Sequence, residues 1–341
     1  MIPRIAGICE KLESFYKNHS LYLWYVTRKD REKMIRKAIS ASYTDTSVKS
    51  NDEKVVICLF EGLVRSGGLA DRFRGILSTY YVCKKLNLKF RLYYIYPFSL
   101  NDYIVPNFYD WRISKKEIKY TIPSESIIVL DTTEDSEFQK SKQEKYLMKH
   151  LSKSSGQIHI YTNASFSYDK NYHILFNELF KPSERLQNAI DNQLRLINGR
   201  YVSVSCRFLD LLGDFNETYG YNLHLEDSEK EHLLNSILGQ IEKIHSQNEG
   251  IKVLVNSDSR TFLDFVTQHT NYTYIIPGEI THIDNQISVD NYEKYEKTFL
   301  DFFMIANADH IYTLKTGRMH NTGYPYAASF VYNKPYSLIC F

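Results

Sequence analysis

Short apolar runs alternate along this chain with longer segments of helical periodicity. The first run, residues 54–60 (KVVICLF), is continuously apolar after its first residue, which is typical of a strand buried on both faces of a sheet. A loop that contains glycine follows, and residues 69–86 place most of their apolar side chains near one helical face. Further strands are predicted at 89–96, 126–132 and 157–163. The order strand, loop, helix, strand predicts a βαβ unit in the first half of the chain.

A second series of elements begins near residue 183. Ser183 is a suitable N-cap for a helix that runs to about Asn198, and Gly199 provides its end. Strands are then predicted at 201–208, 251–259, 272–278 and 310–314, and helices at 227–247, 261–268, 291–306 and 325–331. Regular alternation of this kind predicts a mostly parallel, doubly wound sheet.

The pattern as a whole predicts an α/β protein with two Rossmann-like, doubly wound domains that face a central cleft. Residues 1–50 are predicted to form an N-terminal helical segment, followed by α/β domains at 51–180 and 181–341 that join near residues 165–185. The basic stretch from Arg28 to Arg36 is interpreted as a solvated helix face, and the alternative is an anchor at an anionic membrane surface.

Composition narrows the choice of partners and compartment. The 42 basic and 40 acidic residues give a net charge of only +2, so the basic stripe expected of a nucleic-acid-binding protein is lacking. The five cysteines have no CxxC spacing, which argues against a zinc site, and Cys58, Cys83 and Cys206 in apolar runs suit buried, reduced thiols. We expect a cytoplasmic protein with no signal peptide and no membrane span, since no apolar stretch approaches about 20 residues.

Ligands of open α/β sheets bind beyond the carboxyl ends of the strands, so the residues that follow each strand are the candidates for chemistry. After the first strand, adjacent Gly67 and Gly68 leave free N–H groups at the start of a helix, which is a natural anion site. The alternative is a plain turn, with Arg72 and Arg74 on a solvated helix face.

Arg207 stands at the end of the predicted strand 201–208. A guanidinium at the end of a buried strand is costly unless an anion meets it, and it can grip a diphosphate through two parallel hydrogen bonds. The alternative is a structural ion pair of Arg207 with Asp210 or Asp214.

Two later strand ends carry polar residues. Asp258 and Ser259 are suited to bond a base or ribose, or alternatively to cap the following helix. Thr316 and Gly317, after the last predicted strand, offer hydroxyl and N–H donors to a phosphate, or alternatively form a polar loop.

Taken in order, these motifs resemble the fucosyltransferase superfamily that includes bacterial α-1,6, protein O- and plant xyloglucan fucosyltransferases. Residues 67–72 (GGLADR) are similar to its glycine loop G-L-G-N-R, and residues 205–210 (SCRFLD) to its H-x-R-x-x-D signature, with Ser205 in place of the histidine. Asp258-Ser259 matches a D-S-like pair, and Thr316 lies in the position of a Ser/Thr-containing loop. The resemblance covers roughly residues 54–332.

This resemblance implies a GT-B-type glycosyltransferase whose donor substrate is GDP-fucose and whose acceptor is a glycan, with inversion at the anomeric carbon and no metal or other cofactor. The N-terminal α/β domain would face the acceptor and the C-terminal domain would bind the nucleotide sugar. Arg207 would neutralise the leaving β-phosphate together with Thr316, while Asp258 and Ser259 would hold the nucleoside.

A carboxylate is expected to act as general base, and the candidates are Asp214, Asp210, Glu61 and Asp71. The acceptor is expected near Glu61 and the glycine loop with Gly67, Gly68, Asp71 and Arg72. The alternatives are a transferase that uses another nucleotide sugar, such as a UDP-sugar, and a non-catalytic nucleotide- or sugar-binding module. The chain would serve polysaccharide biosynthesis, with peripheral membrane association as an option.

Overall fold

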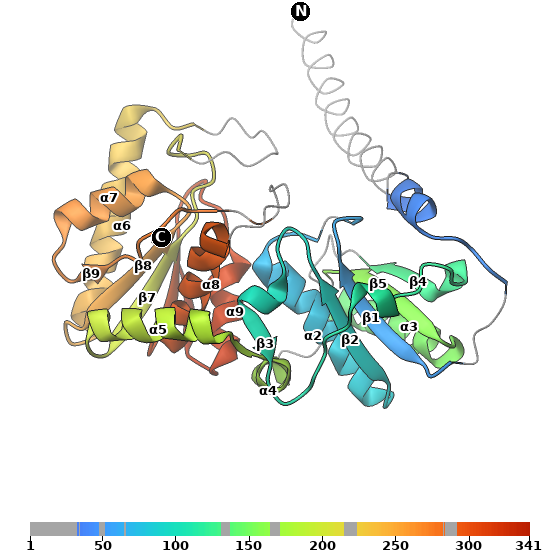
Figure 1. Ribbon diagram of the computed structural model, residues 1–341. Helices are drawn as coiled ribbons and strands as arrows, with labels where there is room; N and C mark the ends of the chain where they lie inside the picture. The colour runs from blue at the N-terminus through green and yellow to red at the C-terminus, as the bar shows by residue number, and fades with distance from the viewer. Residues whose placement is uncertain are drawn as a thin grey trace, which may run out of the picture.

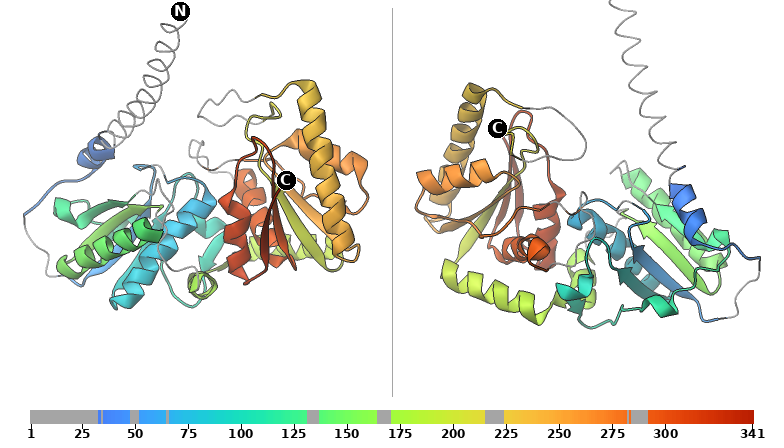
Figure 2. Two further views of the ribbon diagram at one scale, coloured as in Figure 1. Left: turned by 180° about the vertical axis from the view of Figure 1, so that it is seen from behind. Right: turned by 45° about the horizontal axis from the view of Figure 1, so that its top comes forward.

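A computed structural model of the chain describes residues 33, 35–47, 52–64, 66–130, 137–163, 171–214, 224–281, 283 and 292–341. It contains two parallel sheets, each with its own set of helices, and the helices α8 and α9 lie between the sheets (Figure 1 and Figure 2). The mixed α/β class with parallel sheets that the sequence predicts is confirmed.

The first sheet has four parallel strands, whose order is β2 (Lys89–Tyr94), β1 (Val55–Phe60), β5 (Gln157–Thr162) and β4 (Ile127–Leu130). Alternate residues of β1 serve different cores, because Val56 and Cys58 pack with the helix α2 (Leu69–Lys85), whereas Ile57 and Leu59 pack on the opposite face. That opposite face is covered by Tyr43 and by residues 113–122. The helix α3 (Glu137–Lys153) contributes Leu147 and Leu151 to the core on the α2 side.

The second sheet has five parallel strands, whose order is β11 (Tyr336–Cys340), β10 (Ile311–Lys315), β7 (Tyr201–Cys206), β8 (Lys252–Ser257) and β9 (Thr273–Tyr274). The helices α6 (Asp227–Gln247) and α7 (Arg260–His269) cover one face, and α5 (Glu184–Ile197), α8 (Tyr292–Asn307) and α9 (Gly323–Val331) cover the other. After β7, the chain places β8 on one side of that strand and later places β10 on its other side. The strand order therefore reverses between β7 and β10, which is where α/β sheets form their ligand crevice.

An aromatic junction joins the two sheets. Phe73 of α2 lies 5.2 Å from Phe176 of the helix α4 (Tyr172–Leu179) and 5.3 Å from Phe302 of α8, between ring centroids. The short antiparallel pair β3 (Ile104–Pro106) and β6 (Phe180–Pro182) also lies here. The hydrophobic core thus runs continuously from one sheet to the other, and β6 spans the domain boundary predicted at 180/181.

Several expected elements differ in extent from those observed. The strand predicted at 272–278 is formed only at Thr273–Tyr274, and α3, α4, β3, β6 and β11 were not predicted. Within the predicted N-terminal helical segment, residues 35–42 are helical. Residues 1–32 of that segment, with the first part of its basic stretch, and residues 164–170 of the predicted junction lie outside the described residues.

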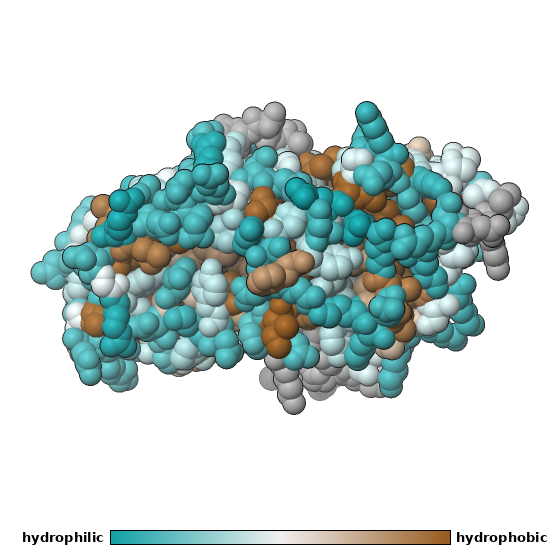
Figure 3. Space-filling view, turned by 60° about the horizontal axis from the view of Figure 1, so that its bottom comes forward, coloured by the Kyte–Doolittle hydropathy of each residue, from teal (hydrophilic) through white to brown (hydrophobic). Residues whose placement is uncertain are grey.

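The surface and the cysteines agree with the composition. Hydrophilic side chains cover most of the face shown in Figure 3, with smaller hydrophobic areas between them. Cys58, Cys83 and Cys206 are free and buried, as predicted, and burial raises the pKa of Cys58 to about 12. Within the described parts of the chain, none of the helices has the length and apolar character needed to cross a membrane.

Candidate functional site

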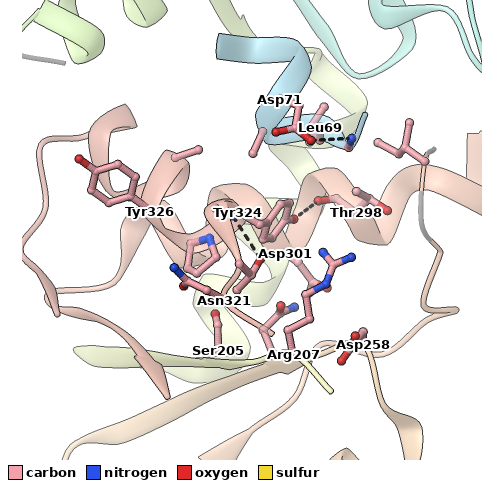
Figure 4. A pocket seen from close by; sticks show the side chains of 18 of the residues that line it. Leu69, Asp71, Ser205, Arg207, Asp258, Thr298, Asp301, Asn321, Tyr324 and Tyr326 are labelled. Atoms are coloured by element: carbon pink, nitrogen blue, oxygen red, sulfur yellow. Dashed lines mark hydrogen bonds between the residues drawn. The ribbon is translucent and has the colours of Figure 1, made fainter. Parts of the chain in front are cut away.

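A pocket of about 730 Å³ lies at the crevice beside β7. Its wall combines the start of α2 with the carboxyl ends of β7 and β8, residues 279–281 and 283, one side of α8, and the start of α9 (Figure 4). Residues from both halves of the chain therefore contribute to one cavity. Of the site residues predicted from the sequence, the described wall includes Gly67, Gly68, Asp71, Arg207 and Asp258.

Arg207 directly follows β7, and its side chain rises from the sheet into the pocket towards α8 (Figure 4). The backbone beside it is held by Asp258, whose carboxylate accepts hydrogen bonds from the N–H groups of Phe208 (2.8 Å) and Leu209 (2.9 Å). Leu209 has a φ of +55°, a left-handed conformation that is strained for a leucine. The carboxylate of Asp258 thus fixes the strained turn that carries Arg207.

Burial sets the protonation of Asp258. It raises the pKa of this carboxyl to about 6, while the two N–H donors and the charge of Arg207 act in the opposite direction. Asp258 therefore changes its charge at the acidic edge of the physiological range.

Ser205 lies on β7 two residues before Arg207, and its hydroxyl points into the pocket (Figure 4). The side chain is 2% exposed, and its Oγ has no hydrogen-bond partner among the described residues. A buried hydroxyl without a partner is costly to the fold.

The helix α9 begins at the same pocket. Thr322 is its N-cap and accepts a hydrogen bond from the N–H of Tyr324 (3.3 Å), and Asn321 and Gly323 also line the wall. The first N–H groups of a helix lack partners within the helix and carry partial positive charge. Arg207 and the start of α9 therefore offer positive charge to the same cavity.

The start of α2 forms the opposite wall. Gly67 has a φ of +71°, and a Cβ there would lie 2.5 Å from Oδ2 of Asp71, so this turn requires glycine. Asp71 accepts a hydrogen bond from the N–H of Gly68 (3.1 Å) and pairs with Arg74. The predicted glycine loop is thus a real turn at the pocket.

Arg72 supports this turn from inside the protein. It is 3% exposed, and its Nε donates to the carbonyl oxygen of Gly67 (2.9 Å) while a terminal nitrogen donates to that of Tyr96 (2.6 Å). The solvated helix face considered for Arg72 is therefore wrong. Arg72 holds the glycine loop in shape, and it is not part of the pocket wall as far as the structure describes that wall.

Two further predicted residues stabilise the start of α7. Ser259 is the N-cap of this helix and accepts a hydrogen bond from the N–H of Phe262 (3.1 Å). Asp214 accepts hydrogen bonds from the hydroxyl of Ser259 (2.9 Å) and from the N–H of Thr261 (2.7 Å). The helix-capping alternative for Ser259 is confirmed, and neither side chain belongs to the described pocket wall.

Three other predicted residues also lie outside the described wall. Asp210 lies 3.1 Å from Nε2 of His224, and the hydroxyl of Thr316 donates to the carbonyl oxygen of Phe341. Gly317 adopts a φ of +52° in the same loop as Thr316.

Glu61 belongs to a tyrosine cluster at the end of β1. Its two carboxylate oxygens accept hydrogen bonds from the hydroxyls of Tyr120 and Tyr161, both at 2.6 Å. The hydroxyl of Tyr43 lies 2.7 Å from that of Tyr161 and 2.7 Å from Nδ1 of His159. Burial lowers the pKa of His159 to about 3, so this histidine is neutral at physiological pH. Glu61 therefore has a structural role, as a hydrogen-bond acceptor at the end of β1, and it is not in the described pocket wall.

A buried ion pair in the wall was not predicted. Nζ of Lys297 lies 3.0 and 2.9 Å from the two carboxylate oxygens of Asp301 and donates to the carbonyl oxygen of Ile276 (2.8 Å). Burial raises the pKa of Asp301, while Lys297 and a hydrogen bond from Asn256 lower it. The available signal in the sequence was Asp301 inside the apolar run 299–306, four residues after a lysine.

No group of three or more His, Cys, Asp or Glu side chains that could hold a metal ion occurs among the described residues. The positive groups that the structure does place in the pocket wall include Arg207, Lys297 and the start of α9.

The fold is similar to that of known fucosyltransferase structures. No family model matches the chain, and no curated protein matches its sequence. An FUT1 variant from Arabidopsis thaliana in complex with GDP aligns with a TM-score of 0.52 and 11% identity, over 90% of this chain and 74% of that one. The fucosyltransferase NodZ from Bradyrhizobium aligns with a TM-score of 0.50 and 11% identity, over 83% of this chain and 92% of that one. The chain thus has the fucosyltransferase-like fold that the sequence motifs predict.

Proposed function

We propose that this chain is a glycosyltransferase that moves fucose from GDP-fucose to a hydroxyl of a glycan, with inversion at the anomeric carbon and without a metal. The observation that carries the proposal is the position of Arg207 directly after β7, in a pocket where the helix α9 also begins. The two similar structures support the same assignment, since both are fucosyltransferases and one of them contains GDP.

The proposed role of Arg207 is to stabilise the leaving diphosphate. The acceptor oxygen bonds to the anomeric carbon while the bond from that carbon to the β-phosphate oxygen breaks, and its electron pair passes to the diphosphate. Fixed positive charge at that oxygen is worth about 10²–10³ in rate for each donor. Arg207 and the positive end of the α9 dipole supply this charge, in place of the expected Thr316 and Gly317.

The nucleoside is proposed to lie at the end of the pocket formed by Asn256, Asp258 and Thr281. Asp258 acts there by holding the turn that follows Arg207, and Ser259 acts by starting α7. Of the four carboxylates considered as general base, Asp71 alone lines the described pocket, and we assign it that role.

The donor is tested by titration calorimetry of the full chain with GDP, UDP and ADP, followed by turnover of GDP-fucose with candidate glycans. GDP is expected to bind more tightly than the other two. Preference for UDP would support a different donor sugar, and GDP binding without any transfer would support a non-catalytic binding module.

The role of Arg207 is tested by Arg207→Ala, with the exposed Arg260→Ala as the matched control. Arg207→Ala is expected to lower transfer by about 10²–10³ while the chain still folds, and Arg260→Ala to leave transfer intact. Asp71→Asn is expected to lower the transfer rate by about 10²–10⁴ while GDP still binds. Retention of more than about a tenth of the activity in Arg207→Ala would contradict the proposed role.

A further inference from the structure

The pocket has an aromatic end that the donor does not explain. Tyr326 and Phe330 reach it from α9, and Tyr336 and Leu338 reach it from β11. The centroid of the Tyr326 ring lies 4.6 Å from that of Phe330 and 5.1 Å from that of Tyr336. Tyr326 and Leu338 nevertheless remain 42% exposed each, so this end presents apolar surface to the cavity.

The spacing of these residues along the chain places each pair of side chains on one face of its element. Tyr326 and Phe330 are four apart on a helix and share a face, and Tyr336 and Leu338 are two apart on a strand and share a face. The edge strand β11 and α9 therefore bring two pairs of side chains to one patch.

This patch lies next to the place proposed for the diphosphate. Tyr326 is three residues after Gly323, the first residue of α9, which is a rise of about 4.5 Å along the helix axis. In Figure 4, Asp258 and Arg207 lie on one side of the pocket and Tyr326 on the other, with Ser205 and Asn321 between them. A donor with its nucleoside near Asp258 and its diphosphate near Ser205 would carry its sugar between Ser205 and the aromatic patch, so that the patch itself faces the acceptor.

Sugar rings match such a surface chemically. One face of a pyranose carries mainly C–H groups, which pack on the electron-rich face of an aromatic ring, while its hydroxyls need polar partners at the edge. Lys140 and Asp71 supply polar groups on the facing wall. From this we propose that Tyr326, Phe330, Tyr336 and Leu338 form the acceptor subsite, which takes a pyranose ring of the glycan. The inference rests on the proposed function, because the acceptor subsite is located relative to the proposed position of the donor.

The experiment uses saturation-transfer NMR with the full chain in the presence of GDP, and its probes are chitotriose, cellotriose and maltotriose. We expect at least one probe to receive signal from wild type, and Tyr326→Ala to weaken its binding by about tenfold or more. Tyr326→Phe, which keeps the ring, should retain binding. Tyr332→Ala, at a side chain that is 41% exposed but outside the described wall, is the matched control.

The outcomes separate this inference from the proposed function. Absence of signal from all three probes, or equal binding by wild type and Tyr326→Ala, would overturn the subsite. A loss of GDP affinity in Tyr326→Ala would assign the rings to the nucleobase and would also overturn it. Sugar binding that depends on Tyr326 in a chain that does not bind GDP would leave the subsite standing and would refute the donor assignment.

Discussion

Replacing Lys297 with methionine tests the buried ion pair in the pocket wall. Lys297 is 7% exposed and Asp301 is 8% exposed, and the ammonium contacts both carboxylate oxygens and the carbonyl oxygen of Ile276. Methionine has a similar length and keeps most of the apolar stem. The substitution therefore removes the charge and its hydrogen bonds while it retains much of the packing.

The expected cost is about 3–5 kcal/mol of unfolding free energy, because Asp301 is left buried without its cation. A domain is typically stable by about 5–15 kcal/mol, so this is a large fraction of the total. Replacing both partners, as in Lys297→Met with Asp301→Leu, is expected to recover most of the loss, since two apolar side chains leave no unpaired charge.

Urea unfolding at about pH 5 and about pH 8 provides the assay. Lys297 lowers the pKa of Asp301 against the effect of burial, so its removal raises that pKa further. A carboxyl whose pKa is higher in the folded state opposes folding as it ionises, and the loss in Lys297→Met should be larger at pH 8 than at pH 5. Lys243→Met, at an exposed position of α6, is the control. A loss below about 1 kcal/mol, or one that does not change with pH, would refute this reasoning.

Three further results are expected. Asp258, with a pKa of about 6, gains a proton as the pH falls below that value and then accepts the two backbone hydrogen bonds of its turn less strongly. Calorimetry should therefore show that the affinity for GDP falls below about pH 6. A similar pH-dependent fall in Asp258→Asn would contradict this cause. Asp214→Ala should cost about 0.5–2 kcal/mol in thermal or urea unfolding, because it removes a cap of α7, and it should leave GDP affinity unchanged. Gly75→Ala should lower the free energy of unfolding, measured in urea, by about 1–3 kcal/mol or more, since its Cβ would lie 2.1 Å from the carbonyl oxygen of Thr162. Gly239→Ala in α6 is the matched control, because its Cβ would meet open space, and it should raise that free energy by about 0.5–1 kcal/mol.

Strands that are buried along most of their length were predictable from the sequence. Residues 56–60 are buried in β1, and such strands appear in the sequence as uninterrupted apolar runs. The helix α3 was missed because it is rich in lysine and only Leu147 and Leu151 are fully buried among its described side chains. The strand β11 was missed because its residues are only half-buried or exposed.

The site was predictable where a residue type is unusual for its place. A guanidinium after a buried strand identified Arg207, and adjacent glycines identified the turn before α2. A polar residue near a strand end does not reveal which way its side chain turns, and Asp214 and Ser259 turn to cap α7. Choosing between a cap and a ligand contact requires the backbone geometry.

The aromatic junction has a consequence for how substrates enter. Aromatic rings from α2, α4 and α8 pack against one another between the sheets. A hinge motion that separated the two halves would expose Phe73, Phe176 and Phe302 to water at the same time. Such a wide hinge rotation is unfavourable in a block of this kind. Access to the pocket then depends on local rearrangement at its entrance. Cutting the chain at residue 180 would leave each of the two fragments with an exposed aromatic surface that favours aggregation.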